Sequence, residues 1–183
     1  PLLESDSTTH RVITVESVTD VTIQHLRIRN PVGSADSINP AGIRFKTGST
    51  RGAVLNCVFI DCAQAILFDS SSDGVVKNVT IVDENVPYNN TVAAIKFWNS
   101  STGGSLRHCI VYVRGANSIT YHKYAIWVDS SSQTNFVSDY NLIYAGYDSF
   151  NWSCVWGIDG YRYLFGTTSW NAASSQDSNS LGS

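Results

Sequence analysis

The chain has few charged residues, no methionine and no long apolar run, and each shortage excludes a class of protein. Charged residues make up 15% of the 183 residues, against about a quarter in an average globular protein, and the net charge is -3. This balance, with no cluster of Lys or Arg, argues against a nucleic-acid partner. No apolar run approaches the ~18 residues that cross a membrane, so no membrane partner is expected. Because Met is absent, we expect the true start to be missing and interpret the chain as a mature product or a fragment.

The four cysteines lack the spacing of a zinc site. They are Cys57, Cys62, Cys109 and Cys154, and no two of them form a Cys-x-x-Cys pair. No metal site is therefore expected from them. Buried thiols and a single disulfide remain as alternatives, and the sequence does not tell whether Cys62 pairs with Cys154.

What the chain does have is an internal repeat. The phrase Ala-Ile-Lys-Phe at 94–97 returns as Ala-Ile-Leu-Phe at 65–68, Ala-Ile-Trp-Val at 125–128 and Gly-Ile-Arg-Phe at 42–45. With a weaker copy at Ile13, its isoleucines are spaced by 30, 23, 29 and 31 residues. A polar residue follows each isoleucine after 12 or 13 residues: His25, Asn56, Asn78, His108 and Asp139. This part of the repeat has nearly constant length, as in a stacked coil whose insertions map to loops on one face.

Within the constant part, apolar and variable residues alternate with the period of two that is typical of a strand. Each repeat holds about three short strands, too short for a hairpin sandwich, which predicts an all-β solenoid of about five rungs. The inward stack is predicted to contain Ile43, Ile66, Ile95 and Ile126, with Phe45, Phe68, Phe97 and Val128 beside it. Cys57 and Cys109 are predicted to share one inward column two rungs apart, roughly 9.6 Å, which is too far for a disulfide and leaves both as free thiols.

The aligned strands, the Ser-rich turns after them and the polar column together resemble the right-handed parallel β-helix of the pectin-lyase-like superfamily. The resemblance covers roughly residues 12–144, and the tail at 138–181 is similar to a recurrent ending of bacterial secreted β-helix proteins. It implies β-helix rungs over 1–144 and an aromatic-rich C-terminal segment over 145–183 that packs on the same domain. It also implies that the polar column is an asparagine ladder, with the side chain of Asn78 held inside the fold.

The variable letters of the repeated phrase are predicted to face outward and to share one surface. In this superfamily the substrate cleft runs along that face of the first strand. Its predicted substrate-binding residues are Arg44, Lys46, Trp98 and Trp127, and its predicted catalytic residues are Asp69, Lys96 and Asp129. Indole faces stack on sugar rings and cations meet sugar carboxylates. The competing interpretation is an ordinary solvated sheet with cross-strand pairs such as Lys46–Asp69, or aromatics covered by a loop such as 113–124.

The chemistry of this face stays open at the level of sequence. A lyase would need a cation and a base, and Asp69 or Asp129 could hold calcium. A hydrolase needs two carboxylates, but Asp69 and Asp129 lie two rungs apart with Trp98 between them, at about the upper limit for an inverting pair. No Ser–His triad is recognisable, and His122, in a variable loop, is the best histidine candidate.

The sequence therefore predicts a secreted module, extracellular or at the cell surface, that binds or degrades polysaccharide along the first-strand face. If it is an enzyme, the expected type is a polysaccharide lyase or a glycoside hydrolase, with no cofactor apart from the calcium mentioned above. The alternative is a non-catalytic structural or adhesive module of a larger surface protein or phage tail spike. β-Helices often trimerise, and nothing in the sequence decides the oligomeric state.

Overall fold

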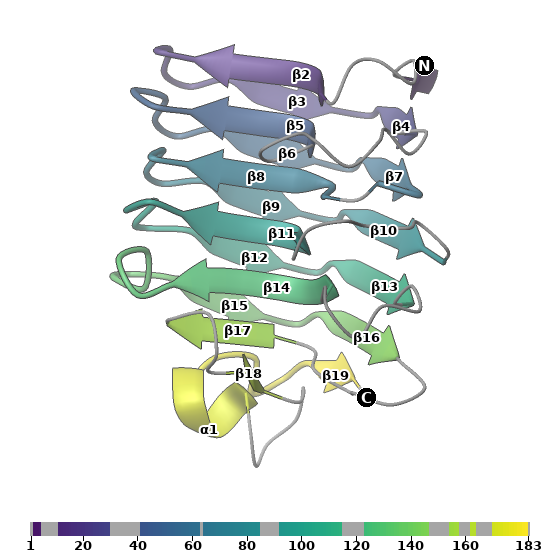
Figure 1. Ribbon diagram of the computed structural model, residues 1–183, viewed down its shortest axis with the longest axis vertical. Helices are drawn as coiled ribbons and strands as arrows, with labels where there is room; N and C mark the ends of the chain where they lie inside the picture. Colours follow the sequence, from purple (N-terminus) through teal and green to yellow (C-terminus); the bar gives the residue numbers. More distant parts are fainter. Residues whose placement is uncertain are drawn as a thin grey trace.

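A computed structural model of the chain shows a parallel β-solenoid, in which short strands stack into three sheets (Figure 1). It describes residues 2–4, 11–29, 41–62, 64–84, 92–114, 123–146, 154–157, 162–163 and 170–182. Each coil passes through the first, second and third sheet in turn and winds right-handed, as parallel crossovers almost always do. The all-β class predicted from the repeat is confirmed.

The first sheet carries the repeated phrase. Its strands are β2 (Arg11–Glu16), β5 (Ala41–Lys46), β8 (Ile66–Asp69), β11 (Val92–Trp98), β14 (Lys123–Asp129), β17 (Cys154–Gly157) and β18 (Arg162–Tyr163). All neighbours in this sheet pair in parallel except β17 and β18, which are antiparallel. From β2 to β14 the chain completes about four turns, slightly fewer than the rung count predicted from the sequence.

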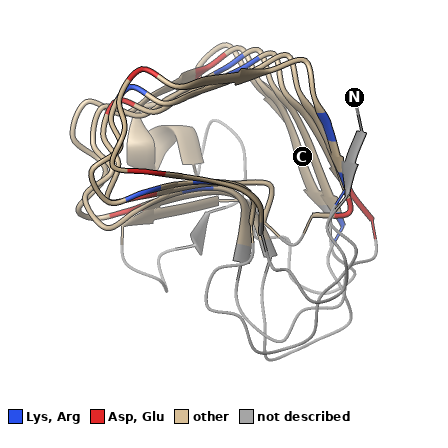
Figure 2. Cartoon of the chain, turned by 90° about the horizontal axis from the view of Figure 1, so that it is seen from above, with Lys and Arg blue, Asp and Glu red and all other residues tan. Residues whose placement is uncertain are grey.

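The second and third sheets complete each coil. The second contains β3 (Thr22–Gln24), β6 (Ala53–Leu55), β9 (Val75–Lys77), β12 (Ser105–Arg107) and β15 (Val137–Asp139). The third contains β1 (Leu2–Glu4), β4 (Arg27–Arg29), β7 (Val58–Ile60), β10 (Thr80–Asp83), β13 (Ile110–Arg114), β16 (Leu142–Gly146) and β19 (Leu181–Gly182). Seen along the axis, successive coils superpose closely, so that equivalent residues form columns (Figure 2).

The predicted inward stack is confirmed. Ile43, Ile66, Ile95 and Ile126 are paired in register and have no exposed surface. Beside them the rings of Phe45 and Phe68 stack with centroids 5.0 Å apart, and those of Phe68 and Phe97 with centroids 4.9 Å apart. Val128 continues this second column and is also fully buried. The coil is therefore filled by columns of like side chains that run along its axis.

Glycines make room for the phenylalanine column. Gly52, Gly74 and Gly104 lie directly against the rings of Phe45, Phe68 and Phe97, one glycine to each ring. A Cβ built on Gly74 would collide with ring carbons of Phe68. The bulky column of the first sheet thus requires a column without side chains in the turn before the second sheet.

The polar column lies at the bend between the second and third sheets, but it differs from the predicted ladder in two ways. The first difference is that its side chains are exposed and not inside the fold. Four members, His25, Asn56, Asn78 and His108, share a positive φ between 52° and 58°. The second difference concerns the fifth member. The fifth member is Tyr140, with φ of 59°, because Asp139 lies one residue earlier, at the end of β15 opposite Arg107. Asn and His tolerate this left-handed conformation better than most residues, which explains their place. The side chain of Asn78 donates to that of Asn56 at 3.2 Å, on the surface and not inside the fold.

A buried asparagine does exist at the C-terminal end of the coil. Asn141 is almost fully buried; its amide donates to the Leu106 carbonyl, Ser138 Oγ and Asp177 Oδ1 at 2.9–3.2 Å. Its Oδ1 accepts from the backbone N–H of Cys109 at 2.9 Å. Asp177 also accepts from the indole N–H of Trp170, the first residue of α1 (Trp170–Ser174), at 2.8 Å. This network fixes the helix against the last coils.

All four cysteines are buried, and none of them forms a disulfide. Cys57 and Cys109 each precede a strand of the third sheet and are separated along the axis by the coil with Val79, as predicted. Burial raises the pKa of Cys109 to about 12, despite backbone hydrogen bonds that favour the thiolate. Burial also raises the pKa of Cys57 and Cys154. These thiols behave as small apolar core groups.

Among the described residues, no helix is long and apolar enough to cross a membrane.

Candidate functional site

The outward residues of the first sheet lie in two columns, and all seven residues proposed from the sequence belong to them. One column runs Glu16, Lys46, Asp69, Trp98 and Asp129, and the other runs Thr14, Arg44, Leu67, Lys96 and Trp127. The parallel register of the strands also places Lys46 beside Asp69 and Trp98 beside Asp129. Alternation along each strand therefore places the candidates on one face, and Trp98 does separate Asp69 from Asp129.

This face is mostly closed to solvent. The exposed fractions are 8% for Arg44, 7% for Asp69, 6% for Lys96 and 3% for Trp127. Trp98, Lys46 and Asp129 are half-buried. Charged residues are seldom buried to this degree unless they are paired, so the partners of each charge decide what the face can do.

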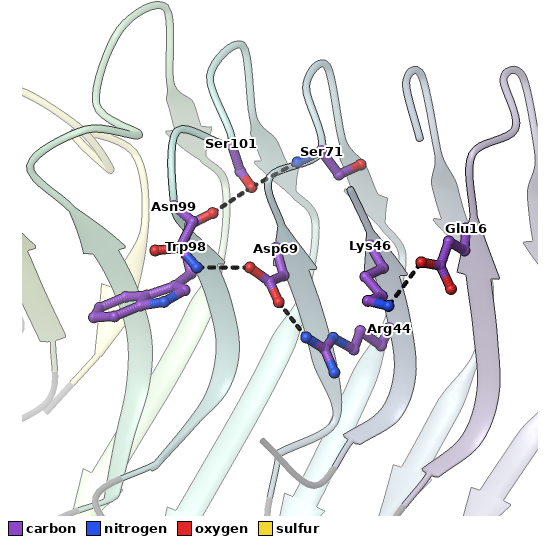
Figure 3. Close-up of polar contacts among 8 residues, drawn as sticks. All are labelled: Glu16, Arg44, Lys46, Asp69, Ser71, Trp98, Asn99 and Ser101. Atoms are coloured by element: carbon purple, nitrogen blue, oxygen red, sulfur yellow. Dashed lines mark hydrogen bonds and ion pairs between the residues drawn. The ribbon is translucent and has the colours of Figure 1, made fainter. Parts of the chain in front are cut away.

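The Arg44 guanidinium forms an ion pair with Asp69 across neighbouring strands (Figure 3). The second oxygen of Asp69 accepts from the side chain of Asn99 at 2.8 Å. Both oxygens of this carboxylate are therefore occupied, which suits a buried charge and leaves it poorly placed to take a proton from a substrate.

The cation of Lys46 is paired as well, but with a different partner from the one predicted. Its Nζ lies 2.7 Å from Glu16 Oε1, on the neighbouring strand toward the N-terminus. The Lys46–Asp69 pair named as an example in the competing interpretation does not form, because Arg44, in the adjacent column, pairs with Asp69. The Lys46–Glu16 pair is partly exposed, so solvent screens it and it contributes little to stability.

Lys96 sits between the two tryptophans. Its Nζ lies 3.9 Å from the ring centroid of Trp98 and 4.1 Å from that of Trp127. The two indoles meet edge to face, with centroids 5.5 Å apart at 88°. The faces of these rings therefore attract an internal cation, a contact worth about 2 kcal/mol when it is shielded from water. Trp127 packs further against Tyr124 and Val155, so it is a core residue of a second, smaller apolar cluster.

Asp129 accepts hydrogen bonds from its own turn and from the equivalent turn of the preceding coil. It accepts from the backbone N–H of Asn99 at 2.9 Å and from the hydroxyl of Ser131 at 3.0 and 3.1 Å. Within the part of the chain that the structure describes, no three His, Cys, Asp or Glu side chains come together to hold a metal ion. The geometry thus brings the predicted residues together but engages their charges with one another.

The sequence interpretation missed a column of serines beside this face. Ser49, Ser71, Ser101 and Ser132 are all buried in the turns after β5, β8, β11 and β14. Ser101 Oγ accepts from the backbone N–H of Ser71 at 3.1 Å (Figure 3). Ser132 Oγ accepts from the backbone N–H of Ser101 at 3.0 Å. The repeated Ser-rich letters after each strand carried the signal, because a buried turn needs hydroxyls to satisfy its backbone.

The histidine candidate His122 lies outside the described residues, as does most of the 113–124 loop. Whether that loop covers the tryptophans therefore stays a prediction.

No family model, curated protein or solved structure matches this chain. The solenoid is accordingly characterised by its own geometry.

Proposed function

We propose that this solenoid is an extracellular or cell-surface module of the pectin-lyase-like architecture, and that it binds polysaccharide along the first-strand face without cleaving it. The proposal that the module does not cleave its ligand rests on one observation: the charged side chains of this face are engaged with other side chains of the same face. Arg44 and Asp69 neutralise each other in a buried pair, and Lys96 is held over two indoles. Half-buried Trp98 is left as the aromatic side chain of this face that can reach a sugar.

A role without any glycan ligand is favoured by one specific observation, the burial of Trp127, Lys96 and Asp69. A face whose groups satisfy one another is what a structural module of a larger surface protein needs. The two candidate functions differ in whether Trp98 contacts a glycan.

Binding to an array of uronide and neutral polysaccharides tests the proposal. Trp98→Ala should lower glycan affinity by about five-fold or more, since a lost stacking contact is worth on the order of 1 kcal/mol beyond burial. Val137→Ala, an exposed apolar position on the second sheet, serves as the matched control and should bind like the parent. If the parent binds no glycan, or Trp98→Ala binds unchanged, the structural role is favoured.

An absorbance assay for unsaturated uronide products tests the statement that the module does not cleave. No product is expected. Product formation that disappears in Lys96→Ala, with the unfolding midpoint still close to that of the parent, would instead support the lyase that the sequence left open.

A further inference from the structure

The bend between the second and third sheets carries two neighbouring cations that form no ion pair among the described residues, with two aromatic side chains beside them. Lys77 ends β9 and Arg107 ends β12, and the two are direct neighbours in the parallel register. Both are exposed. Like charges directly opposite one another destabilise a sheet, so this pair lowers stability unless something neutralises it.

The carboxylate beside Arg107 in the register does not form an ion pair with it. Asp139 is the register partner of Arg107, but its Oδ1 accepts from the backbone N–H groups of Tyr140 and Asn179 at 3.0 and 2.8 Å. Its Oδ2 accepts from the Asn179 side chain at 2.8 Å. Among the described residues, neither Lys77 nor Arg107 forms an ion pair.

Desolvation opposes the charge of Asp139, yet its hydrogen bonds and the nearby Arg107 hold the pKa of this carboxyl below its usual value. The two oxygens of Asp139 therefore accept from Tyr140 and from Asn179 of the C-terminal segment, and no ion pair between Asp139 and the Arg107 guanidinium forms.

Two aromatic rings adjoin the cations. His108 and Tyr140, the next residues after Arg107 and Asp139, stack with centroids 5.5 Å apart and an interplanar angle of 15°. Because the rings face each other, their edges, with the imidazole nitrogens and the phenol hydroxyl, are left for other partners. Tyr140 is 51% exposed. Lys77, Arg107, His108 and Tyr140 form what we call the basic–aromatic strip.

We infer that the basic–aromatic strip binds an acidic polysaccharide, whose sulfate or carboxylate groups meet Lys77 and Arg107. The strip runs along the axis over successive coils spaced by ~4.8 Å, so it suits a chain with repeated anionic groups better than a single small anion. Guanidinium and ammonium donors neutralise such groups with charge-assisted hydrogen bonds. A nucleic acid would call for a broader basic surface than two adjacent cations on a molecule of net charge -3.

This site is separate from the first-strand face and does not depend on Trp98. It lies at a bend that belongs to the second and third sheets, whereas Trp98 belongs to β11 of the first (Figure 1). Each site can therefore fail its test while the other passes.

Dextran sulfate and unmodified dextran are the probes, since they share one sugar backbone and differ in charge. The test variant is Lys77→Gln with Arg107→Gln. The control is Arg27→Gln with Arg114→Gln, two exposed arginines of the third sheet that are likewise outside any ion pair among the described residues. Both double variants remove the same charge. Circular dichroism and the unfolding midpoint check that each still folds.

The parent should bind dextran sulfate, should not bind dextran, and should lose affinity as salt is raised. The test variant should bind at least ten-fold more weakly, while the control stays within about three-fold of the parent. If carboxylate groups are enough for binding, the parent, control and test variants should bind alginate in the same order of affinity as dextran sulfate. Equal losses in both variants would overturn the inference in favour of a diffuse charge effect. So would the absence of binding by the parent, or tighter binding of single-stranded DNA than of dextran sulfate. Trp98→Ala should leave this affinity unchanged.

Discussion

At the scale of single residues, each coil of the phenylalanine column packs a large side chain against a glycine, which has no side chain. The stacked phenylalanines fill the interior only because glycine occupies the adjoining position in every coil where a ring stands. Such columns leave no free volume for an extra methyl group, since protein interiors are close-packed. A single added carbon is therefore a sensitive probe of the fold.

Gly74→Ala should destabilise the protein by about 1–3 kcal/mol, because its new Cβ would overlap the ring of Phe68. Urea unfolding followed by circular dichroism measures the change. Adding Phe68→Leu should recover part of the loss, since it removes the ring carbons in question. If the double variant were no more stable than the sum of the two single changes predicts, the steric explanation would fail.

Two asparagines with different surroundings allow a second test at this scale. Asn141→Ala would leave the buried N–H of Cys109 and the carbonyl of Leu106 without their partner, and should cost about 3 kcal/mol. Asn78 is exposed with φ of 54°, so Asn78→Ala should cost only about 1 kcal/mol, and Asn78→Gly close to nothing. Equal losses at the two positions would argue for a buried ladder after all.

At the scale of strands, the period of two in the sequence was enough to predict which residues face inward and which share the outward face. It could not predict which charges pair. Lys46 has a carboxylate on either side in its own column, and the choice of Glu16 depends on Arg44 reaching Asp69 from the next column. Such a diagonal contact depends on side-chain length and has no period.

The sequence also could not predict how far the outward face is exposed, because a side chain that points out of the coil can still be covered by its neighbours.

The misplaced fifth member of the polar column has a simpler cause. The turn between β14 and β15 spans one residue more than that between β11 and β12, which moves the bend from Asp139 to Tyr140. Turn length varies from coil to coil without changing the strand pattern.

The buried pair of Arg44 and Asp69 provides the prediction at this scale. Removing one partner, as in Asp69→Leu, leaves an uncompensated buried charge and should destabilise by about 3–5 kcal/mol. Replacing both, Arg44→Leu with Asp69→Leu, should recover most of that loss, since an apolar pair needs no desolvation. Denaturant unfolding of the three variants measures the coupling. If glycan binding also survives in the double variant, the pair is structural; if binding is lost while stability recovers, the pair takes part in recognition.

At the scale of the whole molecule, the solenoid is a stack in which each coil contacts chiefly its two neighbours, so the ends govern how it opens. The C-terminal end is held by Trp170, which is fully buried and donates to Asp177. Asp177 in turn accepts from Asn141, beside the coil of Cys109. The buried thiols lie at different distances from this end, with Cys154 in β17, Cys109 before β13 and Cys57 before β7.

Trp170→Ala should therefore loosen the stack from its C-terminal end. The loss of a fully buried indole should cost about 3–5 kcal/mol. With a neutral-pH thiol reagent the parent should react slowly at every cysteine, because burial raises the pKa of Cys57, Cys109 and Cys154 and keeps them as thiols. In Trp170→Ala, mass-spectrometric mapping should find labelling fastest at Cys154, slower at Cys109 and slowest at Cys57. Ala172→Gly, an exposed change in the same helix, is the control and should preserve slow labelling throughout. Equal acceleration at all three thiols would show that the coils open as one unit and would contradict the sequential picture.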